Sequence, residues 1–247
     1  MFKYILLGTI QGITEFLPVS SSGHLVILQK TLGMQGTEVP LFLVLHLGTL
    51  VAVTVFLFKD IKKALTDIKM ILFISVVTLI TGTIGVLGKT FFEGLFSSSK
   101  IVAFALVLNG IVLILTRREK GVGRKQLSLR DSFVLGFAQA AAIVPGISRS
   151  GVTISSLLFR KVDKELSFKI SFLVSLPVIA GAFLLEIRGV NFALRGNLLN
   201  YAAGFMSSLL TGLLALSILK VFVRKARLYL FGYYCLFAAA VIFLFLK

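Results

Sequence analysis

Long apolar runs alternate with short polar segments along most of the chain. Six of these runs approach the roughly twenty residues that a helix needs to cross a bilayer. They cover residues 40–58, 69–88, 101–116, 168–187, 199–219 and 229–246. The pattern therefore predicts six transmembrane helices.

Two further apolar runs are too short to cross a bilayer, and each of them breaks in a polar, glycine-containing turn. Residues 2–17 lead into PVSSSG at 18–23, and residues 132–144 lead into PGISRSG at 145–151. Such a break is tolerated at membrane depth only when it is buried in protein or lines a water-filled cavity. Both segments are therefore predicted to be re-entrant broken helices, which return to the side that they entered.

The two broken segments also resemble each other. With a shift of 128 residues, LGTIQGITEFLPVSSSG (7–23) aligns with LGFAQAAAIVPGISRSG (135–151), and six of seventeen positions are identical. Three predicted spans separate the segments, so they enter from opposite sides, as in an inverted-topology repeat with a polar site near the midplane. We expect one all-α membrane domain over 1–247, with repeat one at about 1–125 and repeat two at about 126–247.

Composition and charge agree with a multi-pass membrane protein. Hydrophobic residues make up 57% of the chain and charged residues 15%, whereas soluble domains are about half apolar and a quarter charged. The net charge is +16. Eighteen of the 26 Lys and Arg residues lie on one predicted face, in the segments 59–69, 117–130, 160–169 and 220–227.

This asymmetry predicts that the basic face is cytoplasmic and that both termini and the cavity are external. The charge therefore needs no nucleic-acid partner. Seven basic residues fall on the other face, and Arg149 belongs to neither, because it lies between two apolar segments.

The first turn carries a carboxylate close to hydroxyl groups and an imidazole. Gln11 and Glu15 are one helical turn apart and share a face. A carboxylate within a membrane helix costs about 2.5–3.5 kcal/mol, so Glu15 is expected to be a metal ligand, a general base or the partner of a polar group. His24 follows the serines at 20–22 and is a candidate proton shuttle or nucleophile, with an interfacial filler as the alternative.

The second turn carries Arg149, with Ser148, Ser150 and Thr153 nearby. A guanidinium group fits phosphate oxygens in two-point contact. Pairing of Arg149 with Glu15 is the alternative, and it is compatible with function because a substrate can displace that partner.

The two turns together suit a phosphate or diphosphate carried on a lipid. A diphosphate implies a divalent cation, Mg²⁺ or Ca²⁺, because such ions bind one or two carboxylates together with substrate phosphates. His46 faces the same cavity or is a core histidine. Asn109 and Glu186 are expected to serve helix packing or the interface.

QGITEFLPVSSSGH (11–24) and PGISRSGVT (145–153) resemble the two signature motifs of the undecaprenyl-diphosphatase family, also called the bacitracin-resistance protein family. The resemblance implies an integral-membrane hydrolase of the bacterial inner membrane. Such an enzyme removes the terminal phosphate of undecaprenyl diphosphate and so recycles the lipid carrier for peptidoglycan synthesis. It also implies inverted repeats with paired re-entrant regions.

The same resemblance implies roles for individual residues. Glu15 resembles the essential acidic residue, and Ser21 and His24 resemble the catalytic hydroxyl and imidazole. Arg149 resembles the diphosphate-binding arginine. The residues expected to support Arg149 in binding substrate are Ser148, Ser150, Thr153, Ser20 and Ser22. Gln11 stands where many members have a second Glu, so the expected metal ligands are Glu15 and Gln11.

Several alternatives remain open at this point. The preferred scheme has Ser21 as nucleophile and His24 as its base, and a phosphohistidine or a directly activated water are the other options. Inverted repeats are also a transporter architecture, so a lipid-phosphate transporter or flippase is the competing function. The acid-phosphatase superfamily is rejected, because the chain has no Arg-Pro motif and no histidine after His46. A homodimer and the preferred prenyl length are left undecided.

Overall fold

The computed structural model describes residues 1–31, 39–96, 98–119, 121, 123–187 and 198–245. Within these residues all regular structure is helical. The first part of the chain forms α1 (Phe2–Phe16), α2 (Ser21–Thr31), α3 (Val39–Phe56), α4 (Phe58–Leu65), α5 (Ile68–Leu87), α6 (Lys89–Leu95), α7 (Ser99–Leu115) and the 3-10 turn η1 (Thr116–Arg118). The second part forms α8 (Leu129–Ala141), α9 (Arg149–Phe159), α10 (Lys164–Ile187), α11 (Leu198–Arg224) and α12 (Tyr229–Phe245).

The six predicted spans coincide with α3, α5, α7, α10, α11 and α12. Four helices are long and apolar enough to cross a membrane alone: α5, α7 with η1, α10 and α11. The bent pair α3–α4 passes the same test when its two helices are taken together, as a broken span or a re-entrant loop, and α12 is a shorter apolar helix. The prediction of an all-α, multi-pass membrane protein is confirmed. Residue 246, the end of the last predicted span, lies outside the described residues.

One predicted connecting segment is helical rather than irregular. Residues 58–65 of the basic segment 59–69 form α4, which turns by 75° from α3 at Leu57. The helix starts with Asp60 in its first turn and ends with Lys62 and Lys63 in its last, an order that complements the helix dipole. The sequence analysis missed it because the segment is short and half polar.

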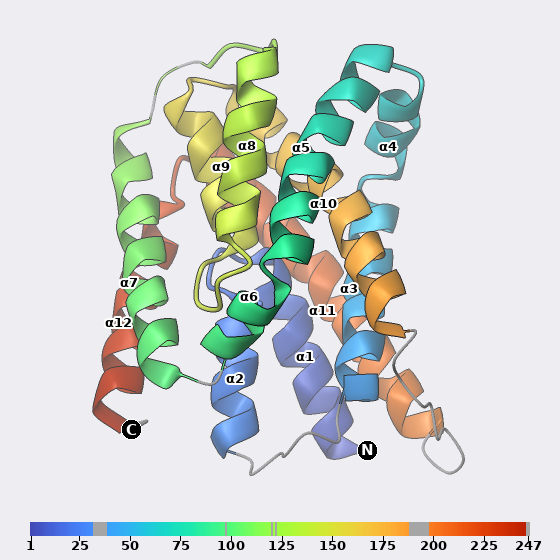
Figure 1. Ribbon diagram of the computed structural model, residues 1–247, viewed down its shortest axis with the longest axis vertical. Helices are drawn as coiled ribbons and strands as arrows, with labels where there is room; N and C mark the ends of the chain where they lie inside the picture. Colours follow the sequence, from blue (N-terminus) through green and yellow to red (C-terminus); the bar gives the residue numbers. More distant parts are fainter. Residues whose placement is uncertain (32–38, 97, 120, 122, 188–197, 246–247) are drawn as a thin grey trace.

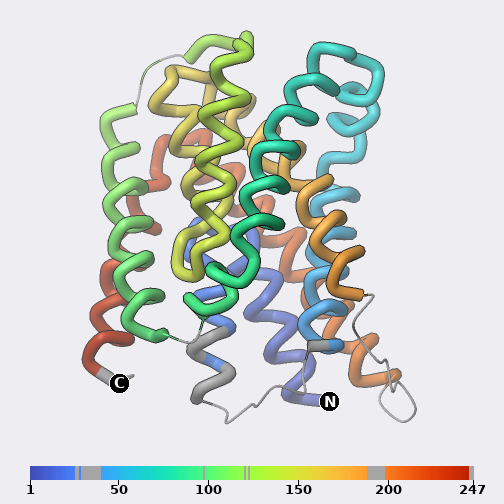
Figure 2. The backbone as a smooth tube through the Cα atoms, in the orientation of Figure 1, coloured from blue at the N-terminus to red at the C-terminus, as the bar shows by residue number. Residues whose placement is uncertain are grey.

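The two broken segments are helical hairpins, as predicted, and they enter the bundle from opposite ends. Figures 1 and 2 show α1–α2 rising from the end that holds both termini and α8–α9 descending from the other end, with their turns near mid-height. Ser20 adopts a φ of +68° in the first turn and Gly146 a φ of +102° in the second. A Cβ atom at 146 would lie 2.5 Å from the Val102 carbonyl oxygen, so the second turn needs glycine.

The helices of the two halves pack against each other in a reciprocal manner. The re-entrant helix α1 lies along α11, and the re-entrant helix α8 lies along α5. The approach of α1 to α11 is close, because a Cβ atom at Gly12 would lie 2.5 Å from the Ser208 carbonyl oxygen. Each hairpin is thus held by a span from the other half of the chain. The repeat boundaries at 125 and 126 stay a prediction.

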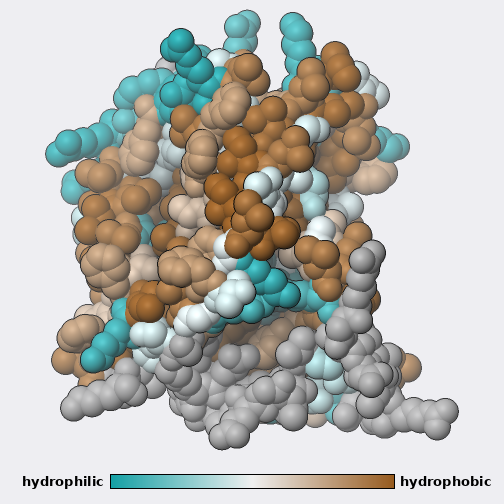
Figure 3. Space-filling model, in the orientation of Figure 1, coloured by the Kyte–Doolittle hydropathy of each residue, from teal (hydrophilic) through white to brown (hydrophobic). Residues whose placement is uncertain are grey.

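The four basic segments lie at the upper end of the bundle in Figure 1, opposite the termini. Polar side chains gather along this edge in Figure 3, and apolar side chains cover the middle of the visible face. This division fits a bilayer around the middle of the bundle. Arg188, Arg195 and Lys247, which were assigned to the other face, lie outside the described residues.

A buried carboxylate organises the basic end. Asp131, in the first turn of α8, is fully buried, and both of its oxygens accept hydrogen bonds of 2.7 Å from Arg124 Nη2. Arg160 Nε and Ser128 also donate to it. Burial opposes ionisation of Asp131, but the hydrogen bonds from Arg124, Arg160 and Ser128 outweigh burial and lower its pKa to about 2.

Candidate active site

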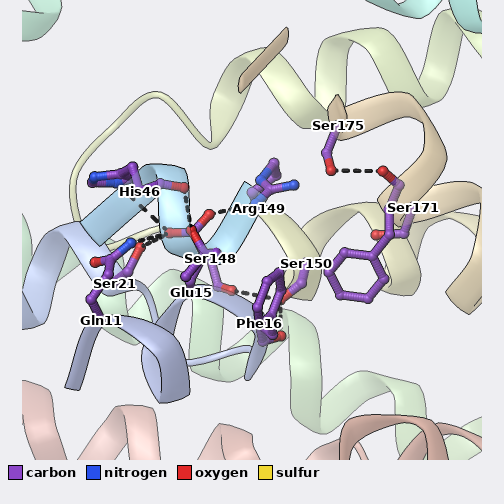
Figure 4. Close-up of polar contacts among 12 residues, drawn as sticks. Gln11, Glu15, Phe16, Ser21, His46, Ser148, Arg149, Ser150, Ser171 and Ser175 are labelled. Atoms are coloured by element: carbon purple, nitrogen blue, oxygen red, sulfur yellow. Dashed lines mark hydrogen bonds and ion pairs between the residues drawn. The ribbon is translucent and has the colours of Figure 1, made fainter. Parts of the chain in front are cut away.

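The last turn of α1 and the first residue of α9 meet where the two hairpins touch. Arg149 Nη2 lies 2.5 Å from Glu15 Oε1, and the two side chains are only 16% and 9% exposed. Figure 4 shows the two groups reaching toward each other from different hairpins. This is the pairing that the sequence analysis gave as the alternative for Arg149. A buried pair of this kind leaves a costly charge if either partner is removed.

The second oxygen of the Glu15 carboxylate collects further donors. Ser21 Oγ donates to Glu15 Oε2 at 2.8 Å, and Gln11 Nε2 donates to the same oxygen at 3.1 Å. His46 Nε2 lies 4.0 Å from it. Glu15 is therefore the centre of the cluster, with Arg149 at one oxygen and neutral donors at the other.

The turns are fixed to each other by buried hydrogen bonds. Asn109 Nδ2 donates to the Pro18 carbonyl oxygen at 3.0 Å, and Asn109 Oδ1 accepts from the Ser148 backbone N–H at 3.1 Å. Ser20 Oγ accepts from the Gly146 backbone N–H at 3.2 Å. The expectation that Asn109 serves packing is confirmed, and its position explains how two turns so far apart in sequence keep one geometry.

The predicted substrate-binding serines and threonine divide into two groups. Ser20, Ser22 and Ser148 line the cavity described below. Ser150 and Thr153 do not, because the Ser150 hydroxyl donates to the Phe16 carbonyl oxygen and Thr153 Oγ1 contacts the Arg149 carbonyl oxygen and Ser171. These two residues support the backbone around Arg149. Their role as substrate contacts stays a prediction.

His24 points away from the Glu15 cluster. Its Nδ1 lies 2.8 Å from the Ser20 carbonyl oxygen, its Nε2 lies 2.7 Å from the Tyr234 hydroxyl, and its ring stacks on the Tyr234 ring. Among the described residues that line the cavity, the imidazole comes from His46 instead. The catalytic role of His24 stays a prediction, and the hydrogen bond of Ser21 to Glu15 pairs that hydroxyl with a carboxylate rather than with His24.

A cavity of about 340 Å³ lies beside this cluster. Its polar lining residues are Glu15, Ser20, Ser21, Ser22, His46, Ser148, Arg149, Thr81, Gln139 and Glu186. Its apolar lining residues are Leu43, Leu50, Phe96, Ala142, Ile143, Ile147, Val178, Ile179, Ala182 and Phe183. A cavity lined by both kinds of side chain fits an anionic head group attached to a hydrocarbon chain.

The donor set for a metal ion is small. Within the described residues no group of three or more His, Cys, Asp or Glu side chains could hold a metal ion. Gln11 Oε1 is buried and has no hydrogen-bond partner, and it lies on the residue that already contacts Glu15. One carboxylate and one amide oxygen are enough protein ligands for Mg²⁺ when phosphates and water complete its shell. Gln11 is buried and does not line the cavity, and its Nε2 faces Glu15, so a cation held by Glu15 and Gln11 and shared with a bound diphosphate stays a prediction.

The chain is similar to known proteins over almost its whole length. Residues 4–241 match a family model described as "Bacitracin resistance protein BacA". The chain is 41% identical over 245 residues to a protein of Thermotoga petrophila named undecaprenyl-diphosphatase, covering 97% of this chain and 98% of that protein. It is 38% identical over 246 residues to an undecaprenyl-diphosphatase of Halothermothrix orenii, covering 95% of this chain and 94% of that protein.

Proposed function

The chain belongs to the bacitracin resistance protein BacA family, and from that membership we propose that it is an integral-membrane undecaprenyl-diphosphatase. It hydrolyses undecaprenyl diphosphate to undecaprenyl phosphate and inorganic phosphate. This reaction recycles the lipid carrier for peptidoglycan synthesis and counters bacitracin. The observation that carries the proposal is the Arg149–Glu15–Ser21 cluster in the lining of a cavity that apolar side chains also line.

The polar and the apolar residues that line the cavity would bind different parts of the substrate. The Arg149 guanidinium group can take phosphate oxygens in two-point contact, and the diphosphate then competes with Glu15 for it. The first prenyl units lie against the apolar wall. A volume of about 340 Å³ is at the lower end of the range for small-ligand pockets, so most of a long prenyl chain must lie in the surrounding bilayer.

The hydrogen bond from Ser21 to Glu15 supports a nucleophilic role for this hydroxyl. Ser21 Oγ forms a bond to the terminal phosphorus while the bridging P–O bond breaks, and its proton passes to the Glu15 carboxylate. Undecaprenyl phosphate leaves with the electrons of the broken bond. Water then hydrolyses the phosphoserine and releases inorganic phosphate. Direct attack by water held at Glu15 is the alternative course.

A divalent cation, Mg²⁺ or Ca²⁺, completes this proposal. Glu15 and the carbonyl oxygen of Gln11 would hold it, and it would neutralise phosphate charge when bound. The residues themselves contribute positioning, because Ser21 and Gln11 both orient the Glu15 carboxylate.

The same proposal includes the orientation of the protein. The basic end lies opposite the termini (Figure 1), and the positive-inside rule would make that end cytoplasmic. The first hairpin, which carries Glu15 and Ser21, enters from the terminal end, so substrate would reach the cavity from outside the cell. Labelling of an engineered cysteine at Ser22 by a membrane-impermeant reagent on intact cells tests this, and labelling from the cytoplasmic side alone would contradict it.

Release of inorganic phosphate in detergent separates the enzyme from the competing transporter, because a transporter needs two compartments and releases none. We expect the purified protein to release one phosphate per undecaprenyl diphosphate and the Arg149→Ala variant to lose this activity. Arg130→Gln is the matched control, since Arg130 is exposed at the basic end. Absence of phosphate release by the wild type with Mg²⁺ or Ca²⁺ present would overturn the proposal.

A further inference from the structure

His46 breaks the apolar face that α3 presents to the cavity. Leu43 lies one turn before it and Leu50 one turn after it, and all three side chains line the cavity. The imidazole is 37% exposed, although it lies within a membrane helix. An imidazole in this position is not part of the dry core, which was one of the two options left by the sequence.

The two ring nitrogens have different surroundings. Nδ1 lies 2.8 Å from the Phe42 carbonyl oxygen of the same helix, and a carbonyl oxygen can only accept, so Nδ1 carries the hydrogen of this bond. Nε2 then carries the lone pair, has no hydrogen-bond partner among the described residues, and can accept a hydrogen bond from a ligand. It lies 4.0 Å from Glu15 Oε2, which is too long for a direct hydrogen bond and leaves room for a third group to bridge the two atoms.

We propose that His46 is a substrate-binding residue, whose Nε2 accepts a hydrogen bond from a protonated oxygen of the terminal phosphate of the lipid diphosphate. This inference rests on the proposed function and names a contact within the same site. Arg149 lies at one oxygen of Glu15 and His46 lies near the other (Figure 4). A diphosphate bound along the carboxylate can therefore contact both residues.

We assign the terminal phosphate to His46, and not the phosphate attached to the lipid, because of the position of the Ser21 hydroxyl. The Ser21 hydroxyl and the His46 ring both lie at Glu15 Oε2, and the phosphorus under attack must lie next to that hydroxyl. The phosphate attached to the lipid then lies toward Arg149, whose neighbour Ile147 belongs to the apolar wall. It follows that His46 distinguishes the diphosphate substrate from the monophosphate product, which lacks the terminal group.

Binding of two non-hydrolysed ligands to purified protein tests this contact. Farnesyl methylenebisphosphonate, in which CH₂ replaces the bridging oxygen, represents the substrate, and farnesyl phosphate represents the product. For His46→Leu we expect the Kd of the bisphosphonate to rise about ten- to hundredfold, as the loss of one hydrogen bond to a charged group does. The Kd of the monophosphate should change by less than about threefold.

Two amide variants keep the test independent of how well His46→Leu folds. His46→Gln retains a polar group of similar reach and should bind the bisphosphonate within about threefold of the wild type, whereas the shorter His46→Asn should not. Thr54→Val is the matched control, because Thr54 is an exposed polar residue of the same helix and its hydroxyl donates to the Leu50 carbonyl oxygen of that helix.

Equal bisphosphonate affinity in wild type, His46→Leu and His46→Asn would overturn the assignment of His46. Equal losses for both ligands would also overturn it, because they would indicate a general disturbance of the cavity. Failure of the proposed function looks different: the wild type would then release no phosphate from undecaprenyl diphosphate, whatever its affinity for the bisphosphonate.

Discussion

Glu15 and Arg149 form an ion pair of 2.5 Å between two hairpins that are 134 residues apart in the sequence. Each residue lies next to the break in its own membrane helix, so each depends on that break to bring it to the cavity. The pair is nearly buried, and it lies beside a hydroxyl group and an apolar wall. An anionic head group that displaces Glu15 from Arg149 would lie next to the Arg149 guanidinium group and close to the Ser21 hydroxyl, the proposed nucleophile.

Arg149→Lys tests whether the fork shape of the guanidinium group matters beyond its charge. Lysine keeps the charge but offers no two-point contact to phosphate. We expect kcat/KM for undecaprenyl diphosphate to fall about a hundredfold, the equivalent of about 3 kcal/mol. A steady-state phosphate-release assay measures this, and a Lys variant as active as the wild type would show that Arg149 acts as a point charge only.

Ser21→Ala removes the proposed nucleophile while leaving Glu15 and Arg149 in place. Phosphate release should fall by at least about a hundredfold. Ser217→Ala is the matched control, because the exposed Ser217 hydroxyl donates to the Leu213 carbonyl oxygen of its own helix. Undiminished hydrolysis by Ser21→Ala would assign the attack to water.

Asn109→Ala should loosen the junction of the hairpins without touching the cavity. The substitution leaves the Ser148 N–H without its partner and the Pro18 carbonyl oxygen with the weak Cys235 thiol donor at 3.5 Å, and an unsatisfied buried group costs about 1–3 kcal/mol. We expect the free energy of unfolding to fall by about 2–4 kcal/mol. Thermal unfolding in detergent measures the change, and an unaltered Tm would show that other contacts hold the turns.

Removal of divalent cations should abolish hydrolysis, because we propose that the ion, held by Glu15 and by phosphate oxygens, neutralises the charge of the diphosphate. Gln11→Glu should then lower the Mg²⁺ concentration needed for half-maximal activity, since a second carboxylate binds the cation more strongly than an amide oxygen does. Full activity of the wild type in EDTA would exclude a divalent cation from the reaction.

Asp131 should make the stability of the basic end depend on acid pH. Its pKa is lowered from 3.8 to about 2 in the folded chain, so its contribution is complete above pH 3.8 and is lost as the pH falls toward 2. The contribution is about 2 kcal/mol. Asp131→Asn should be less stable than the wild type at pH 6, and the difference should shrink below pH 3.8. A difference that is constant over this range would contradict the assignment.

Sequence alone predicted the parts of the fold that depend on local composition. Long apolar runs identify the helices α3, α5, α7, α10, α11 and α12, and the polar turns at 18–23 and 145–151 identify both hairpins. The charge of Arg149 also marked the site, because an isolated guanidinium group between apolar segments needs an anionic partner. Sequence alone can give these signals because the bilayer offers no hydrogen-bond partners, so every buried polar group must find one within the protein.

The directions in which the site side chains point could not be predicted from the sequence pattern. His24 is close to Glu15 in sequence but contacts Tyr234 on α12, whereas His46 faces Glu15 from α3. Thr153 follows Arg149 by one turn but bonds to Ser171 on α10. Each of these outcomes is set by packing between helices that are distant in sequence, and a single chain without its fold carries no such information.

The central claim is that Glu15 and Arg149 act as one unit on the diphosphate group of the lipid substrate. The most direct measurement is release of inorganic phosphate from undecaprenyl diphosphate by the purified wild type, Glu15→Gln, Arg149→Ala and the double variant. We expect each single variant to lose at least about a hundredfold and the double variant to lose little more, because residues that act as a unit are not additive. Phosphate release at the wild-type rate by either single variant would contradict the claim.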